Sequence, residues 1–209
     1  MSKPRLLDLF SKAGGTSMGY YRAGFDVTGI DIKPQKRYPF RFILGDALEY
    51  LEEHWREYDV IAASPPCQKW CNHNKNNGHK NYPDLITPLR DLLTAIGKPY
   101  IIENVPKAPL MNPIMLCGAM FNLKVYRHRM FESNLFIKAP THYLHNDNTP
   151  QAGHGGISNK GFISVSGHFS NVPYAQKAMD INWMGQEGLR EAIPPAYTEF
   201  IGRQIIYET

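Results

Sequence analysis

Residues 6–17, LLDLFSKAGGTS, decide the fold of this 209-residue chain. The apolar run over residues 6–10 indicates a buried strand, which ends in a turn that contains Gly14 and Gly15. Residues 18–24 then have the composition of a helix. Strand, glycine turn and helix is the order of a nucleotide-binding βα unit, where the glycines let a ligand approach the backbone. A plain tight turn would use the same two glycines.

The segments that follow continue to alternate between strand and helix. Residues 25–31 predict a second strand that ends in Asp31, about twenty residues beyond the turn, where such folds bind ribose hydroxyls. Residues 40–44 predict a third strand, residues 48–55 an amphipathic helix and residues 58–63 another buried strand. This alternation predicts an α/β fold with a doubly wound, mostly parallel sheet.

Composition limits the class of protein. Hydrophobic residues make up 43% of the chain, enough for the core of one domain, and no stretch approaches the length of a membrane span. Because the first residues lack a signal-peptide pattern, we expect a cytoplasmic protein without a membrane part. The net charge of +4 is compatible with a polyanionic partner such as nucleic acid, but equally with an ordinary lysine-bearing surface.

Cys67 is the first candidate for chemistry. The strand over residues 58–63 stops at two prolines, because proline fixes φ and cannot donate to a sheet ladder. Cys67 follows on this stiff turn, which would aim its thiol as a nucleophile, although most free cysteines are small buried hydrophobes. The remaining cysteines, Cys71 and Cys117, complete neither a disulfide framework nor a zinc motif, so we predict no metal.

Two further segments place charged groups in apolar surroundings. Residues 100–106 predict a buried strand in which Glu103 must be either paired or used. If residues 123–131 form a strand, Arg127 and Arg129 point to the same face and suit an anion or a base edge. A surface ion pair is the alternative for the two arginines.

The rest of the chain divides by composition. Residues 69–81 are basic and rich in asparagine, as expected of a loop that could close over nucleic acid, and their histidines, His73 and His79, lack a metal-ligand spacing. Helical spacing returns at residues 83–96, 175–183 and 196–207. We expect a catalytic core over residues 1–137, a small loop-rich or β insertion over residues 138–174, and a closing segment over residues 175–209.

Five motifs in order along the chain resemble those of the cytosine-C5 DNA methyltransferases. They are residues 8–15 (DLFSKAGG), 64–68 (SPPCQ), 103–105 (ENV), 127–129 (RHR), and 192–195 (AIPP) with 201–202 (IG). Each motif is weak alone, but their order is specific. The resemblance implies a Rossmann-like methyltransferase fold, S-adenosylmethionine as cofactor and DNA, double-stranded by preference, as substrate.

The resemblance also implies roles for individual residues. Cys67 would add to carbon 6 of a flipped cytosine, so that carbon 5 can take the methyl group. Glu103 would hydrogen-bond the ring, and Arg127 and Arg129 would position it. The residues implied for the cofactor are Phe10, Ser11, Ala13, Gly14, Gly15, Asp31, Ile32, Asp46, Ala47 and Pro65. For contacts with DNA we expect Gln68, Lys69, Lys75, Lys80 and Lys160.

Three positions depart from the family pattern. Lys12 stands where glycine is usual, Val125 replaces a glutamine ahead of the arginines, and Glu191 stands in the place of an asparagine near the cofactor. The segment over residues 138–174 is also shorter than the family's target-recognition domain, which is typical of small, phage-like forms.

Other functions compete with this interpretation. The same chemistry could act on RNA or on a free pyrimidine nucleotide. A catalytically silent DNA-binding relative would have no need of Cys67 and Glu103. A dinucleotide oxidoreductase lacks support, because the full glycine fingerprint is missing.

Overall fold

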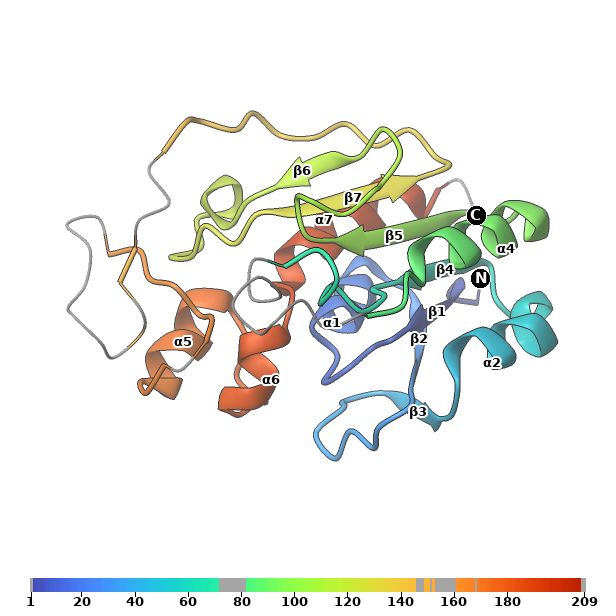
Figure 1. Cartoon of the computed structure of the whole chain (residues 1–209), viewed down its shortest axis with the longest axis horizontal. Helices are drawn as coiled ribbons and strands as arrows, with labels where there is room; N and C mark the ends of the chain where they lie inside the picture. Colours follow the sequence, from blue (N-terminus) through green and yellow to red (C-terminus); the bar gives the residue numbers. More distant parts are fainter. Residues whose placement is uncertain are drawn as a thin grey trace.

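The computed structural model describes residues 2–71, 82–145, 149–150, 152, 161–167 and 169–207. Within these residues a seven-stranded sheet has the order β3-β2-β1-β4-β5-β7-β6 (Figure 1). Strands β1 to β5 pair in parallel, and β7 is antiparallel to both β5 and β6. The predicted α/β fold with a mostly parallel sheet is therefore confirmed. The strands are β1 Arg5–Leu9, β2 Asp26–Asp31, β3 Arg41–Leu44, β4 Val60–Ala63, β5 Tyr100–Asn104, β6 Ile114–Leu116 and β7 Arg129–Ser133.

Helices cover both faces of the sheet because side chains alternate along each strand. Leu6 of β1 packs in a cluster with residues of α1 and α7, whereas Leu7 and Leu9 pack in a second cluster with residues of α2 and α4. The helices are α1 Gly15–Ala23, α2 Ala47–His54, α4 Ile86–Ile96, α5 Val172–Met179, α6 Gln186–Glu191 and α7 Pro195–Ile205, with 3-10 turns at Trp55–Glu57 (η1) and Gly118–Phe121 (η2).

Glycine allows α1 and α7 to approach closely. A Cβ at Gly19 would lie 2.0 Å from Thr198 Oγ1, and one at Gly202 would lie 2.6 Å from Ala23 Cβ. Thr198 Oγ1 also donates a hydrogen bond to the carbonyl of Thr16 at 2.8 Å. Helix α7 thus packs closely against α1, the helix of the first βα unit.

Residues 123–131, which would place Arg127 and Arg129 on one face if they formed a strand, do not form one continuous strand. Val125 makes an isolated bridge with Ile163, and the chain turns at Arg127, whose φ is 33°, so that β7 begins only at Arg129. The reason is tertiary: Val125 is buried in a third cluster, with Phe169, Met179 and other residues near α5 and α6, rather than in the sheet. The antiparallel edge formed by β6 and β7 was not foreseen from the sequence.

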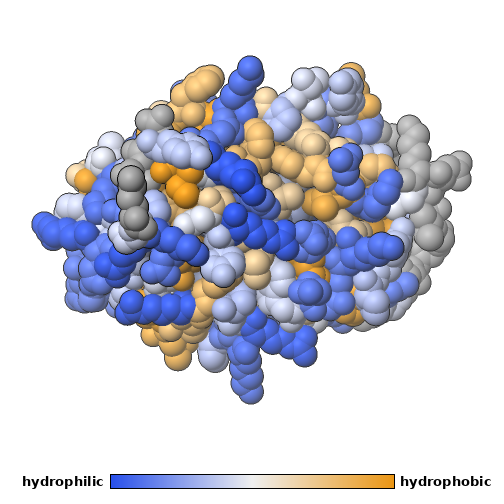
Figure 2. Space-filling view, turned by 180° about the vertical axis from the view of Figure 1, so that it is seen from behind, coloured by the Kyte–Doolittle hydropathy of each residue, from blue (hydrophilic) through white to orange (hydrophobic). Residues whose placement is uncertain are grey.

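The segment predicted as an insertion, residues 138–174, contributes little regular structure where it is described. Its described part forms a bridge at Ile163 and the start of α5 at Val172. Among the described residues, no helix is both long and apolar enough to cross a membrane. On the back of the molecule hydrophilic side chains are interspersed with patches of exposed hydrophobic residues (Figure 2).

Candidate active site

One edge of the sheet carries the candidate site. Parallel strands end at the same edge, and β1, β2, β4 and β5 end here around a cavity of about 670 Å³. The predicted site residues in its lining are Phe10, Ser11, Ala13, Gly15, Asp31, Ile32, Asp46, Ala47, Pro65, Cys67, Gln68, Glu103, Arg127 and Arg129. Residues separated by more than a hundred positions therefore meet in one place.

Several predicted site residues lie elsewhere. Gly14 is outside the lining; it precedes α1 with a φ of 82°, a conformation that favours glycine. The ammonium of Lys69, also outside the lining, lies 5.0 Å from the centre of the Trp70 ring. Lys75, Lys80 and Lys160, with His73 and His79, are outside the described residues.

The turn that carries Cys67 is held by its neighbours in the sheet. The buried Asn104, at the end of β5, donates from Nδ2 to the carbonyl of Pro65 at 2.9 Å. The backbone N–H of Ser64 donates to the carbonyl of Leu9 at 3.1 Å. The proline turn is thus anchored to both flanking strands, which keeps the thiol in one position.

Cys67 shares its surroundings with Cys71, one helical turn later. The two sulfurs lie 3.4 Å apart, and both residues line the cavity. The contact with Cys71 and burial raise the pKa of Cys67, whereas the hydrogen bond with Cys67 lowers the pKa of the more exposed Cys71 to about 7. Two thiolates this close would repel each other, so ionisation of one thiol disfavours ionisation of the other.

Glu103 and Arg129 form an ion pair in the lining of the cavity. Arg129 Nε lies 3.2 Å from Glu103 Oε1, and only 7% of Glu103 is exposed. Burial raises the pKa of Glu103, although Arg129 and a hydrogen bond with Ser64 oppose the shift. A carboxyl group with a raised pKa keeps its proton to a higher pH than an ordinary glutamate does, and in that form it can donate a hydrogen bond.

Arg127 is held by backbone carbonyls rather than by a carboxylate. Its Nη1 donates to Val165 at 2.8 Å and its Nη2 to Arg190 at 2.7 Å. Burial lowers the pKa of Arg127 to about 9, and the neighbouring Arg129 adds to the effect. Within the described part of the chain its Nε is buried without a hydrogen-bond partner, which leaves a donor for a ligand in the cavity.

Acidic and apolar groups also line the cavity. Asp31 accepts hydrogen bonds from the backbone N–H groups of Lys12, at 3.1 Å, and Lys33, at 3.0 Å. Asp46 caps α2 through Oδ1, which accepts from the N–H of Leu48 at 2.8 Å. Two carboxylates beside apolar side chains such as Phe10 suit a ligand with both hydroxyl groups and an aromatic ring.

Lys12 and Glu191, two positions that depart from the family pattern, form an ion pair. Lys12 Nζ lies 3.5 Å from Glu191 Oε2, and both residues line the cavity. Lys12 also adopts a φ of 47°, in the region that a glycine would occupy most easily. An ion pair thus joins the first turn to the end of α6, and neither local segment alone indicates it.

Sequence reasoning also missed Asp8. This fully buried residue of β1 accepts hydrogen bonds on Oδ2 from the hydroxyls of Thr16, at 2.7 Å, and Ser17. Burial raises the pKa of Asp8 to about 6. An acid within the apolar run LLDLF was the available signal, since a buried carboxylate needs partners.

Comparisons with known proteins identify the family. The family model for the C-5 cytosine-specific DNA methylase matches residues 4–112, more than half of the chain. A Type II methyltransferase of Fusobacterium nucleatum, M.FnuDI, is 31% identical over 113 residues, which cover 48% of this chain and 32% of that protein. The chain therefore aligns with about a third of the length of this relative.

Two solved structures share the fold. A putative DNA modification methyltransferase from an Escherichia coli prophage has a TM-score of 0.65 at 14% identity, with 98% of this chain and 99% of that chain covered. The Entamoeba histolytica methyltransferase EhMeth has a TM-score of 0.63 at 13% identity, with 100% and 99% covered. With the family model and the convergence of Cys67, Glu103 and Arg129 on one cavity, the comparisons lead to one conclusion: the chain belongs to the C-5 cytosine-specific DNA methylase family.

Proposed function

We propose that the protein methylates carbon 5 of cytosine in DNA, with S-adenosylmethionine as methyl donor. The observation that carries the proposal is that Cys67, Glu103 and Arg129 line the same cavity as Asp31 and Phe10. A candidate nucleophile and a polarising acid thus share one cavity with groups suited to a nucleoside.

The residues present fit the cofactor. The cavity, of about 670 Å³, is within the range of about 300 to 1,000 Å³ that small-molecule sites occupy. Asp31 would accept from the ribose hydroxyls, while Phe10 and Ile32 would contact the adenine ring and Asp46 its amine. Ser11, Ala13, Gly15, Ala47 and Pro65 would line the rest of the cofactor site. When bound, S-adenosylmethionine supplies an electrophilic methyl group.

Cys67 would provide the covalent step. Its thiolate would add to carbon 6 of cytosine, forming a C–S bond, and carbon 5 would then take the methyl group while S-adenosylhomocysteine leaves. Loss of the proton from carbon 5 to solvent would then break the C–S bond and return the thiolate. The anchored proline turn supports this role, because addition to a ring face requires a fixed line of attack.

Glu103, Arg127 and Arg129 would bind the base. In its protonated form, which burial favours, Glu103 would donate to N3 of cytosine and accept from the exocyclic amine as charge develops on the ring. Arg129, paired with Glu103, would orient this carboxyl group, and the buried Nε of Arg127 would be a further donor. In duplex DNA the target has to be flipped out of the stack before these groups reach it.

The remaining contacts with DNA are also proposed. Gln68 lines the cavity directly after Cys67, so it would meet the flipped base or its neighbours. Lys69, Lys75, Lys80 and Lys160 would contact phosphates. Residues 138–174 would serve as the target-recognition segment between a core over residues 1–137 and the closing segment.

Asp31→Ala should weaken binding of S-adenosylmethionine by about 1.5 to 3 kcal/mol, because a charge-assisted hydrogen bond to the ribose is lost. This corresponds to roughly a 10- to 150-fold increase in Kd, measurable by titration calorimetry. Asp26→Ala, at the exposed opposite end of β2, is the matched control and should bind the cofactor normally. An Asp31→Ala affinity equal to that of Asp26→Ala would exclude Asp31 from the cofactor site.

The substrate is tested by methyl transfer from labelled S-adenosylmethionine to duplex DNA, single-stranded DNA, structured RNA and dCMP. We expect the highest kcat/KM on duplex DNA, with 5-methylcytosine as the product. Preferred transfer to RNA or dCMP would show that the protein carries out the same chemistry on another substrate. If DNA is bound but no acceptor is methylated, the protein is a silent DNA-binding relative and the proposal is wrong.

A further inference from the structure

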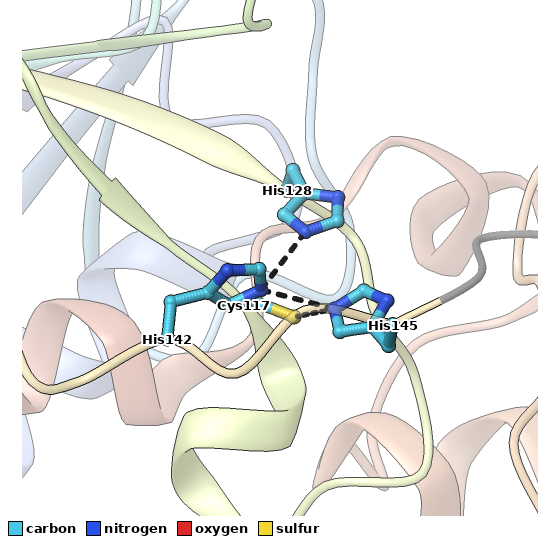
Figure 3. Close-up of side chains that lie close together, drawn as sticks. All are labelled: Cys117, His128, His142 and His145. Carbon is cyan, nitrogen blue, oxygen red and sulfur yellow. Dashed lines mark hydrogen bonds between the residues drawn. The ribbon is translucent and has the colours of Figure 1, made fainter.

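Four potential metal ligands meet outside the candidate active site: Cys117, His128, His142 and His145 (Figure 3). Cys117 Sγ lies 3.3 Å from His145 Nε2. His142 Nε2 lies 3.0 Å from His145 Nε2 and 3.3 Å from His128 Nε2. One ligand atom from each residue is within 4.8 Å of all the others. Three imidazoles and one thiol thus point at a common centre.

The separations fit a tetrahedral metal ion. Zinc binds imidazole nitrogen at about 2.0 to 2.1 Å and thiolate sulfur at about 2.3 Å, so tetrahedral ligand atoms lie about 3.3 to 3.6 Å apart. The three contacts of 3.0 to 3.3 Å are close to this range. The other pairs of ligand atoms lie within 4.8 Å, so binding would draw the rings closer together until all four atoms reach bonding distance of one ion.

Hydrogen bonding between the rings accounts poorly for the arrangement. Each imidazole nitrogen carries either one proton or one lone pair in the ring plane. His142 Nε2 faces the Nε2 atoms of both His145 and His128, so it cannot make two good linear hydrogen bonds. A cation at the centre would accept the lone pair of every ring at once.

The chain that carries His142 and His145 packs little into the core, although at its start the backbone of Lys138 is hydrogen-bonded to Gln204. None of the residues from Lys138 to His145 is buried, and between the two histidines Tyr143 and Leu144 are 81% and 99% exposed. His142 and His145 therefore turn inward while the residues between them face solvent. Stacking of Tyr126 on His145, with ring centres 3.6 Å apart, covers one side of the cluster. A metal ion would supply the stabilisation that this segment does not obtain from a hydrophobic core.

We propose that Cys117, His128, His142 and His145 form a structural zinc site. Thiolate with imidazole ligands favours zinc among the abundant metals, and four protein ligands leave no open position for catalysis. Binding displaces the proton of the Cys117 thiol, which is fully buried in the structure. The proposed site departs from the expectation, drawn from cysteine spacing, that the protein holds no metal. It requires no assumption about the methylation reaction.

The positions of the four ligands would let the ion hold two parts of the chain together. Cys117 precedes η2, His128 stands between Arg127 and Arg129, and the other two ligands follow β7. Zinc would therefore join the arginine turn to the start of the segment over residues 138–174. Without zinc, both should become less ordered even in the absence of DNA and cofactor.

The test is metal content and stability of the full chain, with zinc or cobalt as the probe. We expect about one zinc ion per chain by plasma mass spectrometry, and a lower melting temperature after removal by a chelator. Cobalt should give the visible bands of a tetrahedral site and a thiolate charge-transfer band. Cys117→Ser should abolish that band, and His142→Ala should lower zinc content to about a tenth or less.

Matched controls separate this site from adventitious binding. Cys71→Ser removes a thiol outside the cluster, and His54→Ala removes a surface histidine that contacts Glu57, so both should retain full zinc content. If Cys117→Ser or His142→Ala fails to fold, the spectrum of cobalt-loaded wild type still decides. Folded wild type that binds neither metal stoichiometrically, or cobalt bands without thiolate character, would overturn the site.

Discussion

Cys67→Ser should abolish methyl transfer, with a loss of rate on the order of 10⁴-fold or more. A hydroxyl group at the same position is far less acidic and less nucleophilic than a thiol, so the addition to carbon 6 is lost while the fold is kept. Binding of S-adenosylmethionine should change little, because most of the groups proposed for the cofactor lie at or after the ends of β1, β2 and β3, and the substitution leaves Pro65 in place. Single-turnover transfer of labelled methyl groups to duplex DNA measures the effect.

A covalent trap identifies the sulfur that reacts. An oligonucleotide with 5-fluorocytosine at the target cannot lose its substituent from carbon 5, so wild-type protein with cofactor should form an adduct that survives denaturation. Cys71→Ser is the matched control, since its sulfur lies only 3.4 Å from that of Cys67, and it should still form the adduct. An adduct in Cys67→Ser, or its absence in Cys71→Ser alone, would assign the nucleophile to Cys71.

Glu103→Gln should lower kcat by about 10²- to 10³-fold, the usual effect of losing one group that stabilises developing charge. The amide keeps the size of the side chain but cannot deliver a proton to N3. The raised pKa of Glu103 also sets the direction of the pH dependence. Activity should fall as pH rises and this carboxyl group loses its proton, and the variant should lose that limb of the profile. Steady-state kinetics over a pH series measures both effects.

Glu132 offers a control of the same chemical kind. It is also a buried glutamate paired with an arginine, with Arg90 Nε 2.7 Å from Glu132 Oε1, but it lies outside the cavity lining. Glu132→Gln should lower the melting temperature, because a buried pair is weakened, with kcat largely kept. If both variants lose stability and activity in parallel, the role of Glu103 is structural rather than catalytic.

The sequence alone determined the order of strands and helices from β1 to β5 and the candidate site residues that follow these strands. Strand and helix alternate from β1 to β5 because side-chain periodicity and proline or glycine punctuation act over a few residues, which local inspection can detect. Parallel strands of such a sheet end at one edge, so Asp31, Cys67 and Glu103, each at or just after a strand end, could be expected to meet. The cavity lining bears this out.

The tertiary structure alone decided the contacts between distant segments. The ion pair of Lys12 with Glu191 and the hydrogen bond of Asn104 to Pro65 depend on how elements pack, and no local pattern encodes them. Arg127 leaves the predicted strand because Val125 is buried elsewhere. Cys117, His128, His142 and His145 are separated by loops of unequal length, so their shared centre arises only when β6, β7 and the following segment lie together. Local patterns reflect short-range sterics and burial, whereas these sites come from long-range packing.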